Sequence, residues 1–332
     1  MTYDETVDMW ARFRMAMNEV RPGTVKMGKR NAKHLSPYIG GKQLDDIKTI
    51  DVENALILIK SEGNLLAAGT PMADATVRKI HGAGMKCFQW AIDRELCSTE
   101  RNPFKKASRP KAGKSVKPHA LQPEDAKRLS QFSKKTLECD MEAPITTRRK
   151  IRESAICAAV LIALGTGMRR GEICALDWEN VGDRNIAVVK ALKNEGTIEE
   201  PKNNTSRRNV AIGRELHEIL DEYRAWQERA GVFTAIDGGH PVLMLNNSKR
   251  MSGNVFEHYW ARFREDAGFP GLRFHDLRHT HATMLIAAGV DVKTVQMRMG
   301  HSSAVMTLDV YAHAVPRNDA DAASEISGEL FT

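Results

Sequence analysis

The chain is organised around the stretch FHDLRHTHATMLIAAGV, which covers residues 274–290. It places His275, Arg278 and His279 at positions i, i+3 and i+4, so a helix would carry all three side chains on one face. A guanidinium can bind a phosphate, and the imidazoles beside it can accept or donate a proton. The stretch is therefore the first candidate for part of a phosphate-binding site.

Two other stretches carry polar residues that fit the same chemistry. MRMGHSSAVMTLDVYAHA (residues 297–314) contains His301 and, ten residues later, Tyr311. Far upstream, TGMRRGEICALDW (residues 166–178) contains Arg169. We expect the fold to bring these distant side chains together around one anionic group.

Transfer of a phosphodiester without a metal ion makes definite chemical demands. The transition state carries negative charge on two non-bridging oxygens, and two planar, permanently charged guanidiniums are suitable partners for it. Arg169 and Arg278 would supply them. The reaction also needs a nucleophile and groups that handle protons, for which Tyr311, His275 and His301 qualify, with a lysine near a predicted β-hairpin.

Each of these residues, taken alone, also fits an ordinary role in a core, on a surface or at a helix end. The pair His275 and His279, with His281 nearby, resembles half of a metal site. Arg278 stands between the first two histidines and would repel a cation. We therefore expect no metal ion, and a metal-dependent hydrolase remains an alternative.

Length and charge indicate two domains and a polyanionic partner. The chain has 332 residues, which exceeds one average domain, and 42% of them are hydrophobic, enough for packed cores. The net charge is +7; residues 1–118 hold 21 Lys and Arg against 13 Asp and Glu, whereas the remainder is close to neutral. The charge peaks in RNPFKKASRPKAGKSVK (residues 101–117). Such a cluster attracts nucleic acid, and a solvated linker is the alternative interpretation.

The cysteines and the N-terminus indicate a protein of the cytoplasm. No cysteine pair has the C-x-x-C spacing, which argues against a disulfide framework and a zinc cluster. The five are Cys87, Cys97, Cys139, Cys157 and Cys174. The N-terminus lacks the apolar core of a signal peptide, and no run approaches the roughly 18 apolar residues of a membrane span.

Residues 1–100 are predicted to be helical. An amphipathic stripe in the first helix comprises Val7, Trp10, Phe13 and Met17. Asp51 is the predicted N-cap of the third helix, and Gly63 follows its end. The expected helices cover residues 6–17, about 24–38, 51–62 and 75–96.

The remainder is predicted to be mostly helical, with a minor β element. Pro123 stands near the start of a helix that follows the basic stretch, and residues 153–167 form a helix that is apolar on nearly all sides. The short segments 184–192 and 207–212 contain β-branched residues and are separated by a polar stretch, which predicts an antiparallel hairpin or a three-stranded sheet. Further helices are expected over 213–231 and 254–268, with a short strand near 240–245.

In order and spacing, the motifs TGMRRGE, HDLRH, MGHSS and DVYAH resemble those of the tyrosine recombinases, or phage integrase family. The resemblance covers the chain from about Leu121 to Val315 and continues more weakly upstream. It implies a mainly α fold with a small antiparallel β-sheet. The implied domains are a helical core-binding domain (1–105), a basic interdomain linker (106–118) and a catalytic domain with a C-terminal tail (119–332).

The resemblance assigns a role to each candidate residue. Tyr311 would attack the scissile phosphate, giving a 3′-phosphotyrosyl bond and a free 5′-hydroxyl. Arg169 and Arg278 would bind the non-bridging oxygens, His275 would assist proton transfer, and His301 would donate a hydrogen bond to the phosphate.

The family's catalytic lysine has more than one candidate in this sequence. PKNNTSRRNVAI places Lys202 at its position, as the acid for the leaving oxygen, but the strand reads VAI without the usual proline. Asn203 also replaces a common threonine, so Lys190 and Lys193 remain alternatives. Glu172 matches an acidic position that supports the active site.

The resemblance also implies partners: double-stranded DNA at specific attachment sites, a tetramer on DNA, a four-way junction as intermediate, and accessory directionality or bending proteins. No cofactor, metal or ATP is expected, and the gene would be bacterial or phage-encoded. The C-terminal tail would dock on a neighbouring subunit. The side chains expected to follow the DNA backbone are Lys105, Lys106, Arg109, Lys111, Lys114 and Lys117.

Within the family, an integrase of a phage or integrative element is favoured over a Xer-type dimer-resolving recombinase or an enzyme that relaxes DNA like a type IB topoisomerase. A catalytically idle DNA-binding protein of the same fold is the alternative from a different class. The sequence begins directly at the core-binding helices. The extra domain with which many integrases bind arm-type DNA sites is therefore either lacking or precedes it.

Overall fold

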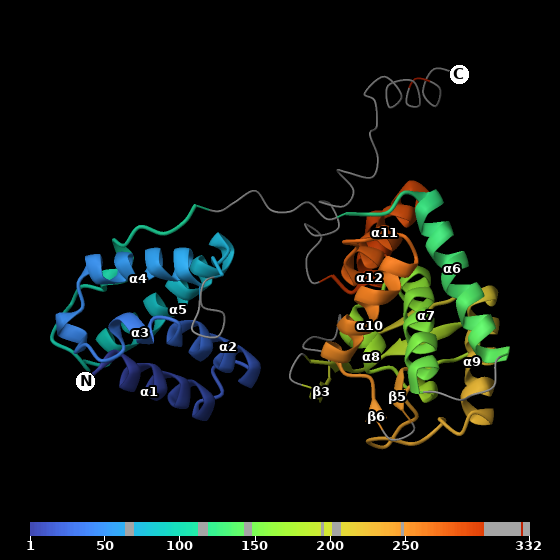
Figure 1. Ribbon diagram of the computed structural model, residues 1–332, viewed down its shortest axis with the longest axis horizontal. Helices are drawn as coiled ribbons and strands as arrows, with labels where there is room; N and C mark the ends of the chain where they lie inside the picture. Colours follow the sequence, from blue (N-terminus) through green and yellow to red (C-terminus); the bar gives the residue numbers. More distant parts are fainter. Residues whose placement is uncertain are drawn as a thin grey trace. The chain divides into compact units, whose positions relative to one another are not determined.

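The computed structural model describes residues 1–63, 70–111, 119–142, 148–193, 196–200, 207–246, 249–301 and 327. The chain divides into two compact units, Met1–Val116 and Lys117–Thr332. Both consist mainly of helices, and the short strands belong to the second unit (Figure 1). The mostly helical fold class expected from the sequence is confirmed.

The N-terminal unit is a helical domain with its own aromatic core. Tyr3, Phe88 and Phe104 are fully buried, and Trp10 is nearly so. Its elements are α1 (Tyr3–Ala16), α2 (Pro22–Lys33), α3 (Ser36–Ile39), η1 (Leu44–Asp46), α4 (Thr49–Glu62), α5 (Asp74–Ile92) and η2 (Pro103–Lys105).

Three details of the predicted helices are wrong. The expected helix 24–38 is broken into α2 and α3 at His34 and Leu35. The N-cap of α4 is Lys48; Asp51 stands three residues further on, where its carboxylate accepts a hydrogen bond from the Lys48 backbone N–H at 2.8 Å. Met17 follows the end of α1 and is 61% exposed, so the apolar stripe is shorter than its spacing predicted.

The first part of the basic stretch packs on the N-terminal unit. Phe104 and Ala107 lie in its core, and the ring of His81 in α5 hydrogen-bonds the Phe104 carbonyl at 2.9 Å. Ser108 donates its backbone N–H to Glu53 in α4. Residues 101–108 are therefore anchored by apolar burial, although their composition resembles that of a solvated linker.

The C-terminal unit is larger. Its helices are α6 (Pro123–Glu142), α7 (Arg148–Thr166), α8 (Arg170–Cys174), η3 (Trp178–Asn180), α9 (Arg214–Arg229), α10 (Gly253–Asp266), α11 (Phe274–Ala287) and α12 (Val292–Met299). Its strands are β1 (Asn185–Val188), β2 (Ala191–Leu192), β3 (Ile198–Glu199), β4 (Arg208–Ala211), β5 (Met244–Asn246) and β6 (Lys249–Arg250).

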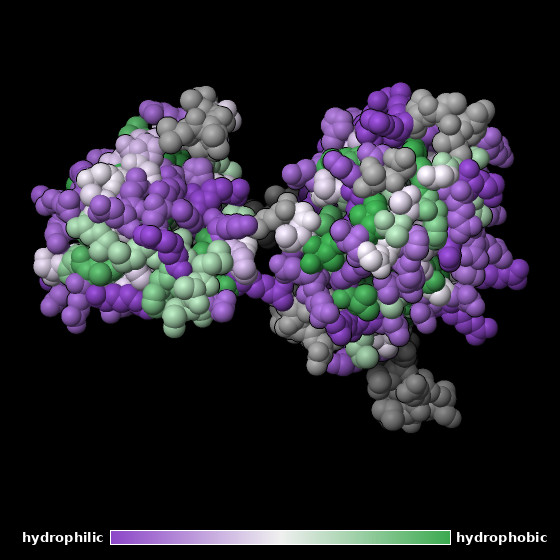
Figure 2. All heavy atoms as spheres, turned by 90° about the horizontal axis from the view of Figure 1, so that it is seen from below, coloured by the Kyte–Doolittle hydropathy of each residue, from purple (hydrophilic) through white to green (hydrophobic). Residues whose placement is uncertain are grey.

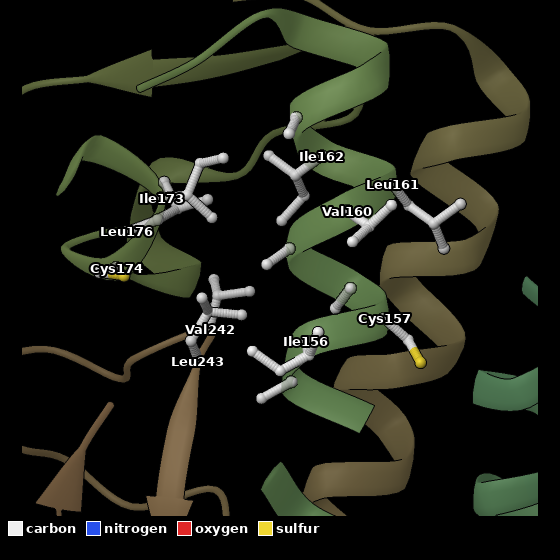
Figure 3. Close-up of a cluster of buried hydrophobic side chains, with 14 of the residues drawn as sticks. Ile156, Cys157, Val160, Leu161, Ile162, Ile173, Cys174, Leu176, Val242 and Leu243 are labelled. Carbon is white, nitrogen blue, oxygen red and sulfur yellow. The ribbon is translucent and has the colours of Figure 1, made fainter. Parts of the chain in front are cut away.

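The helix α7 forms the centre of this unit, as its all-round apolar sequence predicts. It contacts α6, α8, α9, α10, α11 and β5. Figure 3 shows Ile156 and Ile162 pointing toward the side of Leu176 and Leu243, whereas Leu161 and Cys157 point to the opposite side. Both faces of α7 are thus covered, and the loop that follows it is held in a fixed position.

The strands form three separate antiparallel pairs. β1 pairs with β4, with Ile186 opposite Val210, while β2 and β3 form a small hairpin between them in the sequence. β5 pairs with β6. The antiparallel pairing is confirmed, but in the described part of the chain each sheet has two strands, so a three-stranded sheet is not formed.

On the face shown in Figure 2, hydrophilic residues predominate on both units, and apolar residues form separate patches. Within the described ranges, we find no helix with the length and apolarity needed to cross a bilayer.

Candidate functional site

The helix α11 carries the first group of candidate residues. Asp276 accepts a hydrogen bond from the Arg273 backbone N–H at 3.0 Å and closes the first turn of the helix. Further along, Thr280 accepts a hydrogen bond from the backbone N–H of Leu121 at 2.9 Å, which ties α11 to the segment before α6. On the helix, the rings of His275 and His279 meet edge to face at 4.9 Å.

Arg278, on the same helix, is buried, with only 3% of its surface exposed. Its Nη1 donates to the Gly167 carbonyl at 2.6 Å, and its Nη2 donates to the Met299 carbonyl at 2.5 Å. Burial lowers the pKa of Arg278 to about 9, and the nearby charge of Arg169 acts in the same direction. The guanidinium therefore occupies a site where positive charge is already concentrated.

Arg169 reaches the same place from the start of α8. Its Nη2 donates to the Gly300 carbonyl at 2.7 Å, next to the carbonyl that Arg278 binds. Its Nη1 donates to Glu172 Oε1 at 2.8 Å. The structure thus brings together the two arginines that are 109 positions apart in the sequence, as the chemistry of the motifs required.

Glu172 is a buried acid between two guanidiniums. It is 4% exposed and accepts hydrogen bonds from Arg169 and, at 2.9 Å and 3.2 Å, from Nη2 and Nη1 of Arg208. Burial alone would raise the pKa of Glu172, but the hydrogen bonds and charges of the arginines outweigh it and lower the pKa to about 2. Glu172 is therefore a carboxylate that holds Arg169 in position.

His301 follows the end of α12. This helix begins after Asp291, whose side chain caps Thr294, and it ends at Gly300 with a left-handed φ of 63°. His301 is 7% exposed. Burial lowers its pKa to about 4, helped by Arg278 and Arg169, so the ring is neutral at pH 7. One ring nitrogen of neutral histidine is a donor, which suits a hydrogen bond to a phosphate.

A cleft of about 420 Å³ opens beside Arg169, whose side chain is 36% exposed. His275 is exposed at this cleft. The lining residues are Arg169, Arg170, Gly171, Leu192, Lys193, Glu257, Phe274 and His275. The cleft is partly open and carries basic side chains, which fits an anion that belongs to a large ligand.

The alternative lysines differ in where they lie. Lys193 lines the cleft and approaches Glu199 at 4.0 Å across the hairpin of β2 and β3. Lys190 instead forms an ion pair with the buried Asp177, which also binds Arg250. Lys190 is therefore paired with Asp177 and does not line the cleft, whereas Lys193 lines it together with Arg169.

Several predicted residues lie outside the described residues: Tyr311, Lys202, Lys114 and Lys117. The remaining residues of the proposed DNA path are exposed and belong to the N-terminal unit; they are Lys105, Lys106, Arg109 and Lys111. Their contact with DNA stays a prediction.

Within the described residues, the three histidines of α11 do not form a group with the geometry of a metal site. His281 points away from the cleft: its Nδ1 donates to the Leu164 carbonyl at 2.7 Å, and its Nε2 accepts from Arg298 at 2.9 Å. Asp276, which stands beside His275 where a metallohydrolase helix carries its base, is bound by Arg273.

Sequence reasoning missed three residues at this site. His281 and Arg298 connect α11 to α12, and Arg208 binds Glu172. One signal in the sequence was the pair of arginines before the strand VAI. The glycine of TGMRR was another, because Gly167 has a φ of 66° and a Cβ there would lie 2.7 Å from His281.

Comparison with known proteins agrees with the geometry. Residues 119–317 match the model described as "Phage integrase family", and residues 2–57 match "Phage integrase, N-terminal SAM-like domain". The ICEBs1 integrase of Bacillus subtilis is 30% identical over 175 residues, which cover 51% of this chain and 48% of that protein. The chain spans about half the length of this and two further curated relatives.

Two solved structures are similar over nearly the whole chain. The Tn1549 transposon integrase in complex with a circular intermediate DNA has a TM-score of 0.74 at 22% identity and covers 99% of both chains. A lambda integrase tetramer bound to a Holliday junction has a TM-score of 0.65 at 19% identity, covering 96% of this chain and 80% of that one. At such identities the likeness establishes the fold.

Proposed function

Because the chain belongs to the phage integrase family, the tyrosine recombinases, we propose that it is a site-specific DNA recombinase of the integrase type. Its substrate is double-stranded DNA at specific sites, which it cuts and rejoins through a covalent phosphotyrosine. The observation that carries this proposal is the convergence of Arg169 and Arg278 on adjacent carbonyls beside His301.

In the proposed cleavage step, the Tyr311 oxygen attacks the scissile phosphorus. A bond from phosphorus to the phenolic oxygen forms, the bond to the 5′-oxygen breaks, and a free 5′-hydroxyl leaves. His275 accepts the phenolic proton directly or through water, and Lys202 supplies the proton of the leaving oxygen. Religation reverses these transfers with a 5′-hydroxyl from the other duplex.

The two guanidiniums stabilise the negative charge that develops on the non-bridging oxygens. Arg278 is held rigidly by two carbonyls, and Arg169 is held by Glu172 and one carbonyl, so both are oriented before DNA arrives. Fixed donors of this kind need no reorganisation during the reaction, which makes them effective in a site that excludes water. His301 adds a neutral donor.

The reaction needs neither a metal ion nor ATP in this proposal. The arginines supply the positive charge that a metal would supply in other phosphoryl transfers, and the phosphotyrosyl bond conserves the energy of the broken strand.

The partners follow from the same chemistry. The basic residues from Lys105 to Lys117 follow the DNA backbone, whose phosphates provide most of the affinity. Exchange of strands between two duplexes requires a tetramer on a four-way junction, for which the lambda integrase tetramer is a precedent of the same fold. Accessory proteins that bend DNA, and a cytoplasmic location, complete the proposal.

The test is a nicked suicide substrate that carries the candidate site, incubated with the full chain and EDTA. Cleavage releases a short strand that cannot religate, so a covalent protein–DNA adduct accumulates. Tyr311→Phe is expected to abolish the adduct and to retain DNA binding. Tyr259→Phe is the matched control, because Tyr259 contacts Arg152 by its hydroxyl away from the cleft, and it should form the adduct normally.

Other outcomes identify the alternatives. Binding without an adduct would indicate an idle DNA-binding protein, and cleavage that EDTA prevents would indicate a metal-dependent hydrolase. Relaxation of supercoiled DNA without strand exchange would indicate a topoisomerase-like enzyme.

A further inference from the structure

Three consecutive carbonyls at the C-terminal end of α12 each accept a hydrogen bond from a different arginine. The pairs are the Arg298 carbonyl with Arg208 Nε at 2.7 Å, the Met299 carbonyl with Arg278 Nη2 at 2.5 Å, and the Gly300 carbonyl with Arg169 Nη2 at 2.7 Å. The last carbonyls of a helix lack partners within it and form the negative end of its dipole, which favours cations. We call these three arginines the arginine clamp.

Arg208 is the member of the clamp to which the sequence assigned no role. It comes from β4, six residues after Lys202. Its side chain is 7% exposed, and both terminal nitrogens bind Glu172, which in turn binds Arg169. Arg208 therefore connects β4, the start of α8 and the end of α12.

We propose that Arg208 is a positioning residue for strand cleavage, acting through Glu172 on Arg169 and through the Arg298 carbonyl on the segment that leads into His301. The inference rests on the proposed function, since it concerns how the phosphate-binding groups of that function are aligned. Arg208 itself does not contact the phosphate.

The charges explain why a third arginine is needed. Without Arg208, Arg169 would be the only cation that pairs with the Glu172 carboxylate. The carboxylate would then attract the Arg169 guanidinium more strongly and draw it away from the position where it meets the phosphate. With Arg208 present, the carboxylate is shared between two guanidiniums, and its attraction for Arg169 is weaker.

The geometry explains why a lysine would not suffice. Arg208 donates two hydrogen bonds from its terminal nitrogens to the Glu172 carboxylate and a third from Nε to the Arg298 carbonyl in α12, at 2.7 Å. The ammonium of a lysine is a single point of charge and cannot reproduce this planar arrangement. The close approach also requires a glycine at position 300, because a Cβ there would lie 3.0 Å from Arg208 Nη1.

The experiment compares Arg208→Lys with the wild type in the suicide-substrate assay, using the full chain. A displacement of about 1 Å in a catalytic group costs on the order of 100-fold in rate, so adduct formation should slow by about that factor, while affinity for the DNA site is unchanged. Arg250→Lys is the matched control: Arg250 is equally buried against a carboxylate, Asp177, but lies outside the clamp. It should cleave at the wild-type rate.

A second readout separates positioning from simple stability. When the scissile phosphate is replaced by a methylphosphonate, the reacting group loses its charge, and correct placement of Arg169 matters less. The ratio of wild-type to Arg208→Lys rates should therefore shrink on this substrate. A residue that only stabilises the fold would leave the ratio unchanged.

The proposal is overturned if Arg208→Lys cleaves at the wild-type rate, if Arg250→Lys shows the same loss, or if the methylphosphonate leaves the ratio unchanged. If Arg208→Lys does not fold by circular dichroism, Arg208→Gln takes its place. Failure of both to fold, while Arg250→Lys folds, would make Arg208 a stabilising residue and also overturn it. A wild type that forms no Tyr311-dependent adduct would instead overturn the proposed function, and this inference with it.

Discussion

Two buried carboxylates in the C-terminal unit, Glu172 and Asp177, stand five residues apart and have similar neighbours. Each is almost inaccessible to solvent, and each binds two cations. Asp177 binds Lys190 and Arg250, which come from the segment between β1 and β2 and from β6. This second cluster joins the strands to the segment after α8 and has an evident structural role.

The cluster at Glu172 differs because a third cation, Arg278, lies beside it. Among the described residues, Arg278 has carbonyl partners and no carboxylate. Burial and the charge of Arg169 lower its pKa to about 9, which shows that positive charge is costly there. The comparison teaches that the two cations of the Asp177 cluster are balanced by its carboxylate and a neighbouring carbonyl network, whereas the Glu172 cluster has the additional positive charge that the proposed function assigns to binding a phosphate.

The largest expected effect concerns Arg278. Arg278→Lys should slow adduct formation by about 100-fold to 1000-fold, because it removes a fixed donor to the transition state. DNA affinity should change little, since many other phosphates are bound. The measurement is single-turnover cleavage of the suicide substrate. Equal loss of cleavage in Arg250→Lys would remove the distinction between the clusters.

Removal of either acid tests whether the clusters are equally important for stability. Glu172→Gln and Asp177→Asn should each lower the free energy of unfolding by about 3–5 kcal/mol, because each leaves buried cations without their counter-charge. Urea unfolding measures this loss. Under conditions where both variants are folded, only Glu172→Gln should slow cleavage, and slow cleavage in both would contradict the comparison.

Acid should weaken the C-terminal unit through buried histidines around the clamp. His281 and His301 have pKa values lowered to about 4 by burial, so the unfolded chain binds more protons than the folded one between pH 6.5 and 4. Their contribution to stability is complete above pH 6.5 and is lost as the pH falls toward 4, at most about 1.4 kcal/mol per pH unit for each ring.

Urea unfolding at a series of pH values checks this expectation. His281→Gln should reduce the slope of stability against pH. An unchanged slope in His281→Gln would contradict the assignment of a neutral, buried ring between Leu164 and Arg298.

The smallest expected effect concerns the glycine at the end of the clamp. Gly300→Ala and Gly289→Ala both place a side chain at a left-handed φ, of 63° and 82°, and each should cost about 1–2 kcal/mol of stability. Nothing lies within 4 Å of a Cβ at Gly289, whereas one at Gly300 would press on Arg208. Only Gly300→Ala should therefore also slow cleavage in the suicide assay.

Much of the fold could be predicted because its signals are local. The buried α7 follows from an unbroken apolar run, and α11 follows from the spacing of its polar residues. Errors arose where a boundary depends on neighbours in space: the break between α2 and α3, the capping of α4, and the burial of Phe104 within a stretch that is otherwise basic. Composition over a few residues does not record which surface they pack against.

The sequence by itself determined which residue types are available and in what order: two arginines, two histidines and a tyrosine in motifs typical of one family. Tertiary structure alone decided that Arg208 shares Glu172 with Arg169 and that three arginines bind successive carbonyls of α12. The reason is physical. Apart from the local pair of Arg169 and Glu172, these bonds join residues from 21 to 131 positions apart. Such pairs are selected by packing and by the need to satisfy buried charge, which no local pattern encodes.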